Sequence, residues 1–125
     1  MSNFNASQNR AVWFDIPVVD LDRAAAFYGA VLNVKIHKQE FDGVSFCVLE
    51  HQEGNSGCLI LSPNEVSADS GVLLYLNVSG RIRDAVLQTE QRGGKVIQRI
   101  HSIGSHGFRA IILDSEGNRI ALHST

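Results

Sequence analysis

The sequence has few of the residues that mark specialised classes of protein. Its 125 residues include one methionine, one tryptophan, two prolines and two cysteines. Neither sign of charge dominates, because 11 basic residues stand against 13 acidic ones and the formal net charge is −2. A chain without a basic excess has no electrostatic basis for binding nucleic acid or an anionic membrane. We therefore expect neither nucleic acid nor a membrane as a partner.

Long apolar runs are also missing from the sequence. No stretch reaches the roughly 18 apolar residues that a membrane-spanning helix needs. Residues 1–9 lack the basic-then-apolar order of a signal peptide. We expect residues 1–10 to form a flexible tail and residues 11–125 to form one domain with one core.

The two cysteines, Cys47 and Cys58, do not form a recognisable motif. Each lies in an apolar segment, and their spacing is not that of a CxxC pair. Cysteines of this kind are usually buried free thiols rather than a disulfide or a reactive site. Together with the missing signal peptide, they favour a reducing, cytoplasmic location.

An internal duplication organises the chain. The sequence V-W-F-D-I-P-V at 12–18 corresponds to V-L-L-Y-L-N-V at 72–78, and G-V-S-F-C-V-L-E at 43–50 corresponds to G-F-R-A-I-I-L-D at 107–114. The spacing between the two copies drifts only in expected loops, where insertions are tolerated. The duplication predicts two modules, at about 11–64 and 71–125.

Each module has the pattern of one strand, one helix and three further strands. The strands are expected at residues 12–18, 34–41, 44–49 and 58–61, and again at 72–78, 95–100, 108–113 and 119–123. We expect Asp20 and Ser79 to cap the two helices, and Gly93-Gly94 to end the second. The predicted fold class is α+β, with two tandem βαβββ modules forming a curved mixed sheet that encloses a cup-shaped pocket.

Four motifs give the chain a family resemblance. They are W-F-D-I-P at 13–17, D-L-D-R-A at 20–24, A-F-Y at 26–28 and D-S-E-G-N-R-I-A-L at 114–122. Together they resemble the vicinal oxygen chelate superfamily, which includes glyoxalase I, extradiol dioxygenases, fosfomycin-resistance enzymes and bleomycin-binding proteins. The resemblance spans about residues 11–125 and is closest to glyoxalase-related proteins without an assigned role. It also implies a homodimer.

The metal ligands of that superfamily are missing from this chain. In metal-dependent members, four side chains from the two modules hold a divalent ion. Carried over by the resemblance, these positions are Trp13, Ile60, Leu73 (Leu74 if the register slips by one) and Ala121. None of these side chains donates a lone pair, whereas a catalytic zinc site keeps three protein ligands. We therefore expect no metal and no cofactor.

Two titratable residues share strand faces with these positions. Asp15 lies two residues after Trp13, and His123 lies two residues after Ala121. The two could meet across the seam between the modules and act as an acid–base pair. The alternative is that Asp15 accepts backbone hydrogen bonds while His123 is partly solvated near the chain end.

Aromatic residues are expected around the same pocket. A ring at position 13 or 75 would either fill the cavity or offer a stacking surface to a flat organic molecule. His106 follows a glycine in a loop and would border the pocket mouth or simply be exposed. The residues expected to line the pocket are Trp13, Ile60, Leu73, Tyr75, Ala121, Phe108 and His106.

Three functions remain open at this point. The first is a metal-free protein that binds a small, partly apolar or aromatic molecule. The second is a metal-independent lyase or isomerase that uses Asp15 and His123 as acid and base. The third is a catalytically degenerate subunit of a dimer. One fold hosts many chemistries, so the resemblance alone does not choose among them.

Overall fold

The structure is a computed structural model that describes residues 8–125. Its elements follow one another twice in the order strand, helix, strand, strand, strand. They are β1 (Asp15–Val18), α1 (Leu21–Leu32), β2 (Ile36–Phe41), β3 (Val44–Leu49), β4 (Cys58–Leu61), β5 (Leu74–Asn77), α2 (Ile82–Gln91), β6 (Lys95–Ser102), β7 (Phe108–Leu113) and β8 (Arg119–Ser124). Short 3₁₀ turns at Pro63–Glu65 and Gly104–His106 complete the described chain.

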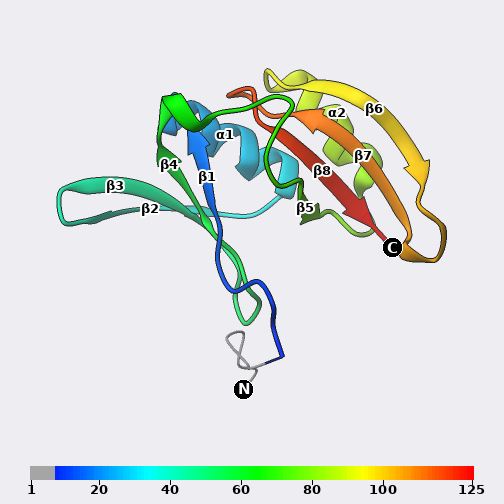
Figure 1. Ribbon diagram of the computed structural model, residues 1–125, viewed down its shortest axis with the longest axis horizontal. Helices are drawn as coiled ribbons and strands as arrows, with labels where there is room; N and C mark the ends of the chain where they lie inside the picture. Colours follow the sequence, from blue (N-terminus) through cyan, green and yellow to red (C-terminus); the bar gives the residue numbers. More distant parts are fainter. Residues whose placement is uncertain (1–7) are drawn as a thin grey trace.

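The strands form two sheets of four, one from each half of the chain (Figure 1). Their orders are β1-β4-β3-β2 and β5-β8-β7-β6. In each sheet the first two strands pair in parallel and the others pair antiparallel. The predicted α+β class with tandem βαβββ modules is therefore confirmed.

The two sheets do not join into one closed sheet. No strand of the first sheet pairs with a strand of the second within residues 8–125. Helix α1 lies between the sheets, and the β2–β3 hairpin extends away from the body of the molecule (Figure 1). The hairpin turns at Asp42 and Gly43, both with positive φ, as a tight two-residue turn requires. The open face of each sheet consequently remains accessible.

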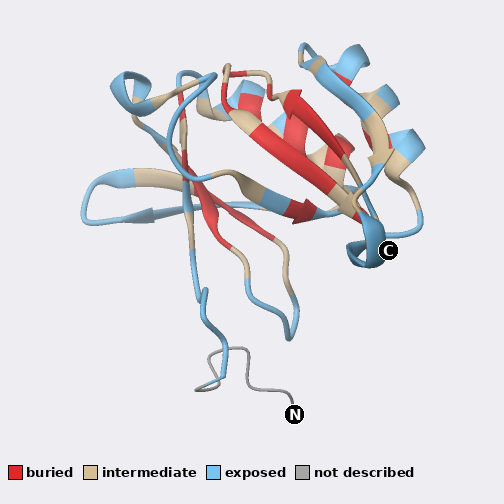
Figure 2. Ribbon diagram, turned by 45° about the vertical axis from the view of Figure 1, so that its right-hand side comes forward, coloured by how far each residue is buried: buried red, intermediate tan, exposed pale blue. Residues whose placement is uncertain are grey.

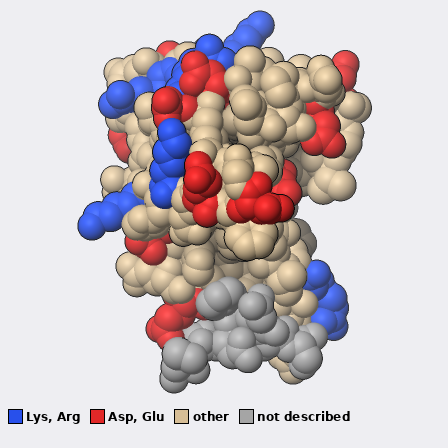
Figure 3. Space-filling view, turned by 90° about the vertical axis from the view of Figure 1, so that its left-hand side faces the viewer, with Lys and Arg blue, Asp and Glu red and all other residues tan. Residues whose placement is uncertain are grey.

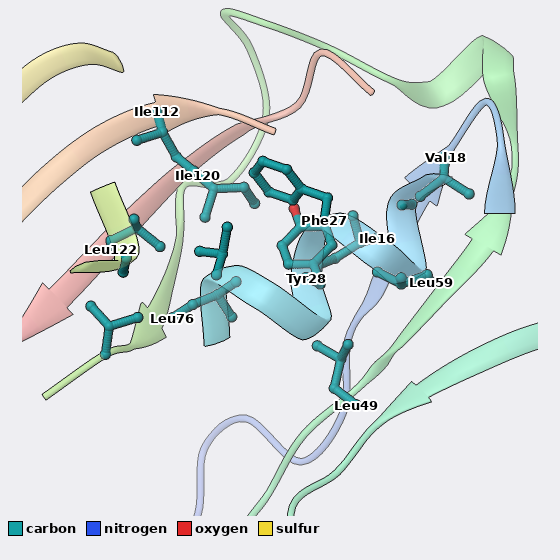
Figure 4. Packing of buried hydrophobic residues seen from close by; sticks show 14 of the residues in the cluster. Ile16, Val18, Phe27, Tyr28, Leu49, Leu59, Leu76, Ile112, Ile120 and Leu122 are labelled. Atoms are coloured by element: carbon teal, nitrogen blue, oxygen red, sulfur yellow. The ribbon is translucent and has the colours of Figure 1, made fainter. Parts of the chain in front are cut away.

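One hydrophobic core holds both modules together. Helix α1 buries Ala24, Phe27, Tyr28 and Val31, a spacing that places them on one face. Phe27 and Tyr28 lie between core residues of the two sheets (Figure 4), and buried residues gather where helices meet sheets while the turn end of the β2–β3 hairpin is exposed (Figure 2). Burial of these side chains from water is the main stabilising term.

The helix ends follow the sequence prediction in one case and depart from it in another. Asp20 caps α1, and its Oδ1 accepts a hydrogen bond from the Arg23 backbone N–H at 3.0 Å. Helix α2 has Arg81 at its N-cap, so the prediction of Ser79 was wrong. The Ser79 hydroxyl instead accepts a hydrogen bond from the backbone N–H of Thr125 at 3.3 Å, because strand β8 ends beside it.

The turn between β7 and β8 fastens the second module to the first through Glu116. The Glu116 side chain is fully buried. Its Oε1 accepts hydrogen bonds from the backbone N–H groups of Val19 and Asp20, at 2.9 and 2.7 Å, and its Oε2 accepts one from Arg23 Nε at 2.8 Å. The carboxylate thus sits at the N-terminus of α1, where the helix dipole favours a negative charge.

Asp114 begins the same turn and is 2% exposed. Its Oδ1 accepts hydrogen bonds from the backbone N–H groups of Glu116 and Asn118, while Tyr28 Oη and Asn118 Nδ2 donate to its Oδ2. Asn118 Nδ2 also donates to the Pro17 carbonyl at 2.7 Å. The turn is therefore bonded both to strand β1 and to helix α1.

The prediction of free, buried cysteines is confirmed. Cys47 and Cys58 are 2% and 4% exposed, and both thiols are free. Between residues 8 and 125, neither helix is long and apolar enough to cross a bilayer.

Candidate functional site

The open face of the first sheet carries an apolar hollow of about 470 Å³. We call it the apolar hollow. Its lining residues belong to the segment that precedes β1, to the β2–β3 hairpin and to strand β4. The lining residues are Trp13, Phe41, Asp42, Val44, Phe46, Cys58 and Ile60. Phe46 and Ile60 face each other across paired strands, which places both side chains on this face. Its lining is almost entirely apolar.

Trp13 forms one wall of the apolar hollow and remains 45% exposed. Its indole Nε1 donates a hydrogen bond to Asp15 Oδ1 at 3.2 Å. Of the two possibilities that the sequence left open, the ring lines the cavity and does not fill it. An exposed ring with a fixed polar edge is suited to stacking against a flat molecule.

Cys58 lies at the base of the apolar hollow. Its thiol donates to Asp15 Oδ1 at 3.2 Å. Burial raises the pKa of the Cys58 thiol to about 12, and the hydrogen bond and negative charge of Asp15 add to this effect. Because a nucleophilic cysteine needs a thiolate, Cys58 serves as an apolar lining residue near neutral pH.

Phe41 and Val44 are lining residues that sequence reasoning missed. They flank the hairpin turn and are 76% and 49% exposed. Opposite residues of an antiparallel pair share a face, and Phe41 is paired with Val44. The sequence does contain a signal for them: Asp42-Gly43 is a strong hairpin-turn motif, and one apolar residue stands on each side of it.

A second hollow, of about 380 Å³, lies on the open face of the second sheet. We call it the arginine hollow. It is lined by Ala68, Asp69, Leu73, Ile97, Gln98, Arg109, Ile111 and Arg119. On strands β7 and β8, Ile112 and Ile120 face the helices and belong to the core. Because successive side chains of a strand point to opposite faces, Arg109 and Arg119 lie on the open face of the sheet. Neither arginine was identified from the sequence.

The other residues predicted to line one pocket are dispersed over this second sheet. Tyr75 and Phe108 are 44% and 46% exposed and line separate shallow hollows. Ala121 is fully buried between its cross-strand neighbours Tyr75 and Ile111. The His106 carbonyl accepts a hydrogen bond from His123 Nε2 at 2.6 Å. Only Trp13 and Ile60 of the predicted set line the apolar hollow, and only Leu73 lines the arginine hollow.

Asp15 and His123 each have other partners in the structure. Asp15 accepts from Trp13 and Cys58 on the first sheet, whereas His123 donates to His106 and packs near Tyr75, with ring centroids 6.3 Å apart. Within residues 8–125 no hydrogen bond or ion pair joins the two. Their acid–base pairing stays a prediction.

The four positions carried over from metal-dependent relatives do not fit a metal ion. Ile60 lies on the first sheet and Trp13 just before its strand β1, whereas Ala121 lies on the second sheet and Leu73 just before its strand β5. Hydrocarbon and indole groups offer no lone pair to a divalent ion. In the described part of the chain, no three His, Cys, Asp or Glu side chains are grouped as ligands.

Basic and acidic side chains are interspersed on the face shown in Figure 3. Such a face presents no extended basic surface to a polyanion.

Comparison with known proteins gives a family match and several structural matches. The family described as "Glyoxalase/Bleomycin resistance protein/Dioxygenase superfamily" matches residues 10–122. The hypothetical protein SA1046 from S. aureus is 19% identical, with TM-score 0.70 and coverage of 95% of this chain and 96% of that one. A glyoxalase/bleomycin resistance protein from Albidiferax ferrireducens T118 is 15% identical, with TM-score 0.73 and coverages of 94% and 99%.

A third structural match is TnmS3, described as an antibiotic binding protein from Streptomyces sp. CB03234. It is 20% identical, with TM-score 0.66, and the match covers 96% of this chain and 98% of that one. No curated protein matches the sequence. At these identities the structural matches establish a shared fold.

Proposed function

We propose that this chain, which belongs to the Glyoxalase/Bleomycin resistance protein/Dioxygenase superfamily, binds a small, partly apolar or aromatic molecule in its apolar hollow without a metal ion. The observation that carries the proposal is the open, almost wholly apolar lining around Trp13. Its volume falls within the range of about 300–1,000 Å³ that is usual for small-molecule sites.

The chemistry of the lining supports an aromatic ligand. Trp13, Phe41 and Phe46 supply three rings around one hollow, and Ile60 and Val44 supply aliphatic surface. Rings attract one another in offset or edge-to-face geometry beyond the gain from burial. Burial of apolar ligand surface here contributes about 25 cal/mol for each Å² removed from water.

The likeness to TnmS3, an antibiotic binding protein, is in keeping with this proposal. Such a likeness raises the expectation of binding, but the site itself has to carry the function. The exposed apolar residues of the first module, such as Phe41 and Leu61 at 76% and 58%, would also suit a homodimer. The dimer, like the cytoplasmic location, stays a prediction.

The proposal first predicts the metal content of the protein. Protein prepared without a histidine tag should contain far less than one divalent ion per chain, because the carried-over ligand positions hold only carbon and indole groups. Elemental analysis by mass spectrometry measures this after dialysis against metal-free buffer. A tightly bound metal at one ion per chain would contradict the metal-free part of the proposal.

The second prediction concerns binding of an uncharged aromatic probe. Trp13 is the single tryptophan of the chain, so all tryptophan emission comes from a residue that lines the apolar hollow. Titration with the dye N-phenyl-1-naphthylamine should quench this emission. Ile60→Glu should weaken the binding about tenfold or more, because a buried carboxylate without a partner opposes an apolar ligand.

Leu87→Glu is the matched control for this experiment. Leu87 is an apolar residue that is 49% exposed on helix α2, which packs against the second sheet. The same charge placed there should leave dye affinity unchanged. Equal affinities for the Ile60→Glu variant and the unaltered chain would show that the apolar hollow is not the binding site.

A further inference from the structure

The arginine hollow is a separate site that shares no lining residue with the apolar hollow. It contains Arg109 and Arg119 but only one acidic residue, Asp69. In the described chain, neither arginine lies within ion-pair distance of a carboxylate. Two unpaired guanidinium groups on one concave face, in a chain of net charge −2, are a local attraction for an anion.

Arg109, on strand β7, is held in a fixed position by side chains from strands β6 and β5. Its Nε donates to His101 Nε2 at 3.0 Å, and its Nη1 donates to Tyr75 Oη at 2.5 Å. His101 Nδ1 lies 2.8 Å from the Arg99 carbonyl, which can only accept. The hydrogen of a neutral His101 is therefore on Nδ1, and its Nε2 lone pair is free to receive the Arg109 hydrogen bond.

These contacts leave one side of the Arg109 guanidinium available. Nε and Nη1 are engaged, and none of residues 8–125 accepts a hydrogen bond from Nη2. A guanidinium fixed before a ligand arrives loses less conformational freedom on binding. Arg109 is thus preorganised as an anion-binding group.

In the described structure, the Arg119 guanidinium makes fewer hydrogen bonds than it has N–H donors. Its Nη2 makes one long hydrogen bond, of 3.3 Å, to the Gly71 carbonyl. Its Nε is buried and has no acceptor among residues 8–125. The Arg119 guanidinium therefore has further N–H donors beyond this one bond, and a carboxylate in the hollow would accept from those that reach the lining.

The rest of the lining defines the remainder of the ligand. Leu73, Ile97 and Ile111 provide aliphatic surface around the two arginines. Inorganic phosphate would leave this surface unused, whereas an organic acid would cover it. We propose that the arginine hollow binds a small organic carboxylate, with the carboxylate on Arg109 and Arg119 and the apolar body on Leu73, Ile97 and Ile111.

The test compares 1-naphthoate with its uncharged analogue 1-naphthamide by isothermal titration calorimetry on the full chain carrying Ile60→Glu, which weakens the binding of either aromatic compound to the apolar hollow. Naphthoate should bind about tenfold more tightly than the amide, since charge-assisted hydrogen bonds to arginine are lost with the charge. Arg109→Met and Arg119→Met should each abolish this preference. Arg109→Lys, which keeps the charge but loses the planar fork, should retain part of it.

Arg92→Met is the control for loss of one positive charge, because Arg92 is exposed at the end of helix α2. It should keep the full preference. The proposal is overturned if naphthoate does not bind, if the two compounds bind equally, or if the preference survives both arginine-to-methionine changes. Trp13 fluorescence separates this outcome from failure of the apolar hollow.

Discussion

Replacing Glu116 with alanine is expected to destabilise the fold by about 3 kcal/mol, the lower end of the cost of breaking a buried ion pair. The lower end applies because Arg23, its partner, is half-exposed. The change removes the acceptor of two backbone N–H groups at the start of α1 and of the Arg23 guanidinium. Urea denaturation should show a lower midpoint with an unchanged slope.

A surface variant checks the Glu116 result. Glu90→Ala removes an exposed carboxylate from helix α2 and should change stability by less than about 0.5 kcal/mol. Burial opposes ionisation of Glu116, but hydrogen bonds from Arg23, Asp20, Ser115 and Val19 outweigh it and lower its pKa to about 2. A midpoint equal to that of the Glu90 variant would disprove the role assigned to Glu116.

The depressed pKa of Glu116 also sets the direction of the pH effect. A carboxylate with a lower pKa in the folded state contributes stability above its unfolded value of 4.5, and this contribution is lost as the pH falls toward 2. The stability difference between the unaltered chain and Glu116→Gln should therefore be greatest near neutral pH. It should shrink through this acidic range.

Local patterns in the sequence were sufficient to predict most helices and strands. The strands at Val44–Leu49, Cys58–Leu61 and Phe108–Leu113 have the predicted bounds. Strand β1 begins at Asp15, three residues later than predicted, because pairing with β4 starts at Asp15 and Cys58. Periodicity predicts which residues alternate, whereas partner strands decide where pairing begins.

The candidate site was less accessible to sequence reasoning. The family resemblance put Trp13, Ile60 and Leu73 around one pocket, but neither the resemblance nor strand alternation contains information on the distance between two sheets. That distance is set by contacts such as Tyr28–Asp114 and Pro17–Asn118, between residues 86 and 101 positions apart. Residues predicted to surround one pocket therefore lie around separate hollows.

The same contacts explain what the family motif encodes. Asp114, Glu116 and Asn118 belong to the motif that carried the resemblance, and all three bond the second module to the first. Their side chains are buried at the seam and do not line either hollow. A chain can therefore keep these three residues and its fold while positions that line the hollows change, which is why the three residues predict architecture better than chemistry.

Asp114→Asn tests that interpretation and is expected to destabilise the fold by about 3 kcal/mol, although it changes the side-chain volume little. The Asp114 carboxylate accepts four hydrogen bonds, from the N–H groups of Glu116 and Asn118, from Asn118 Nδ2 and from Tyr28 Oη. An amide has one oxygen, so its NH₂ group would face buried donors. Thermal and urea unfolding both measure the loss.

The matched control is Asp42→Asn, the same chemical change in the exposed hairpin turn, where asparagine tolerates the observed φ of 54°. It should leave stability within about 0.5 kcal/mol. Tyr28→Phe removes one of the four donors, and the loss in the Tyr28→Phe, Asp114→Asn double variant should be smaller than the sum of the two single losses. Strict additivity would mean that helix α1 and the β7–β8 turn do not stabilise each other through this hydrogen bond, and the seam would then rest on the apolar core alone.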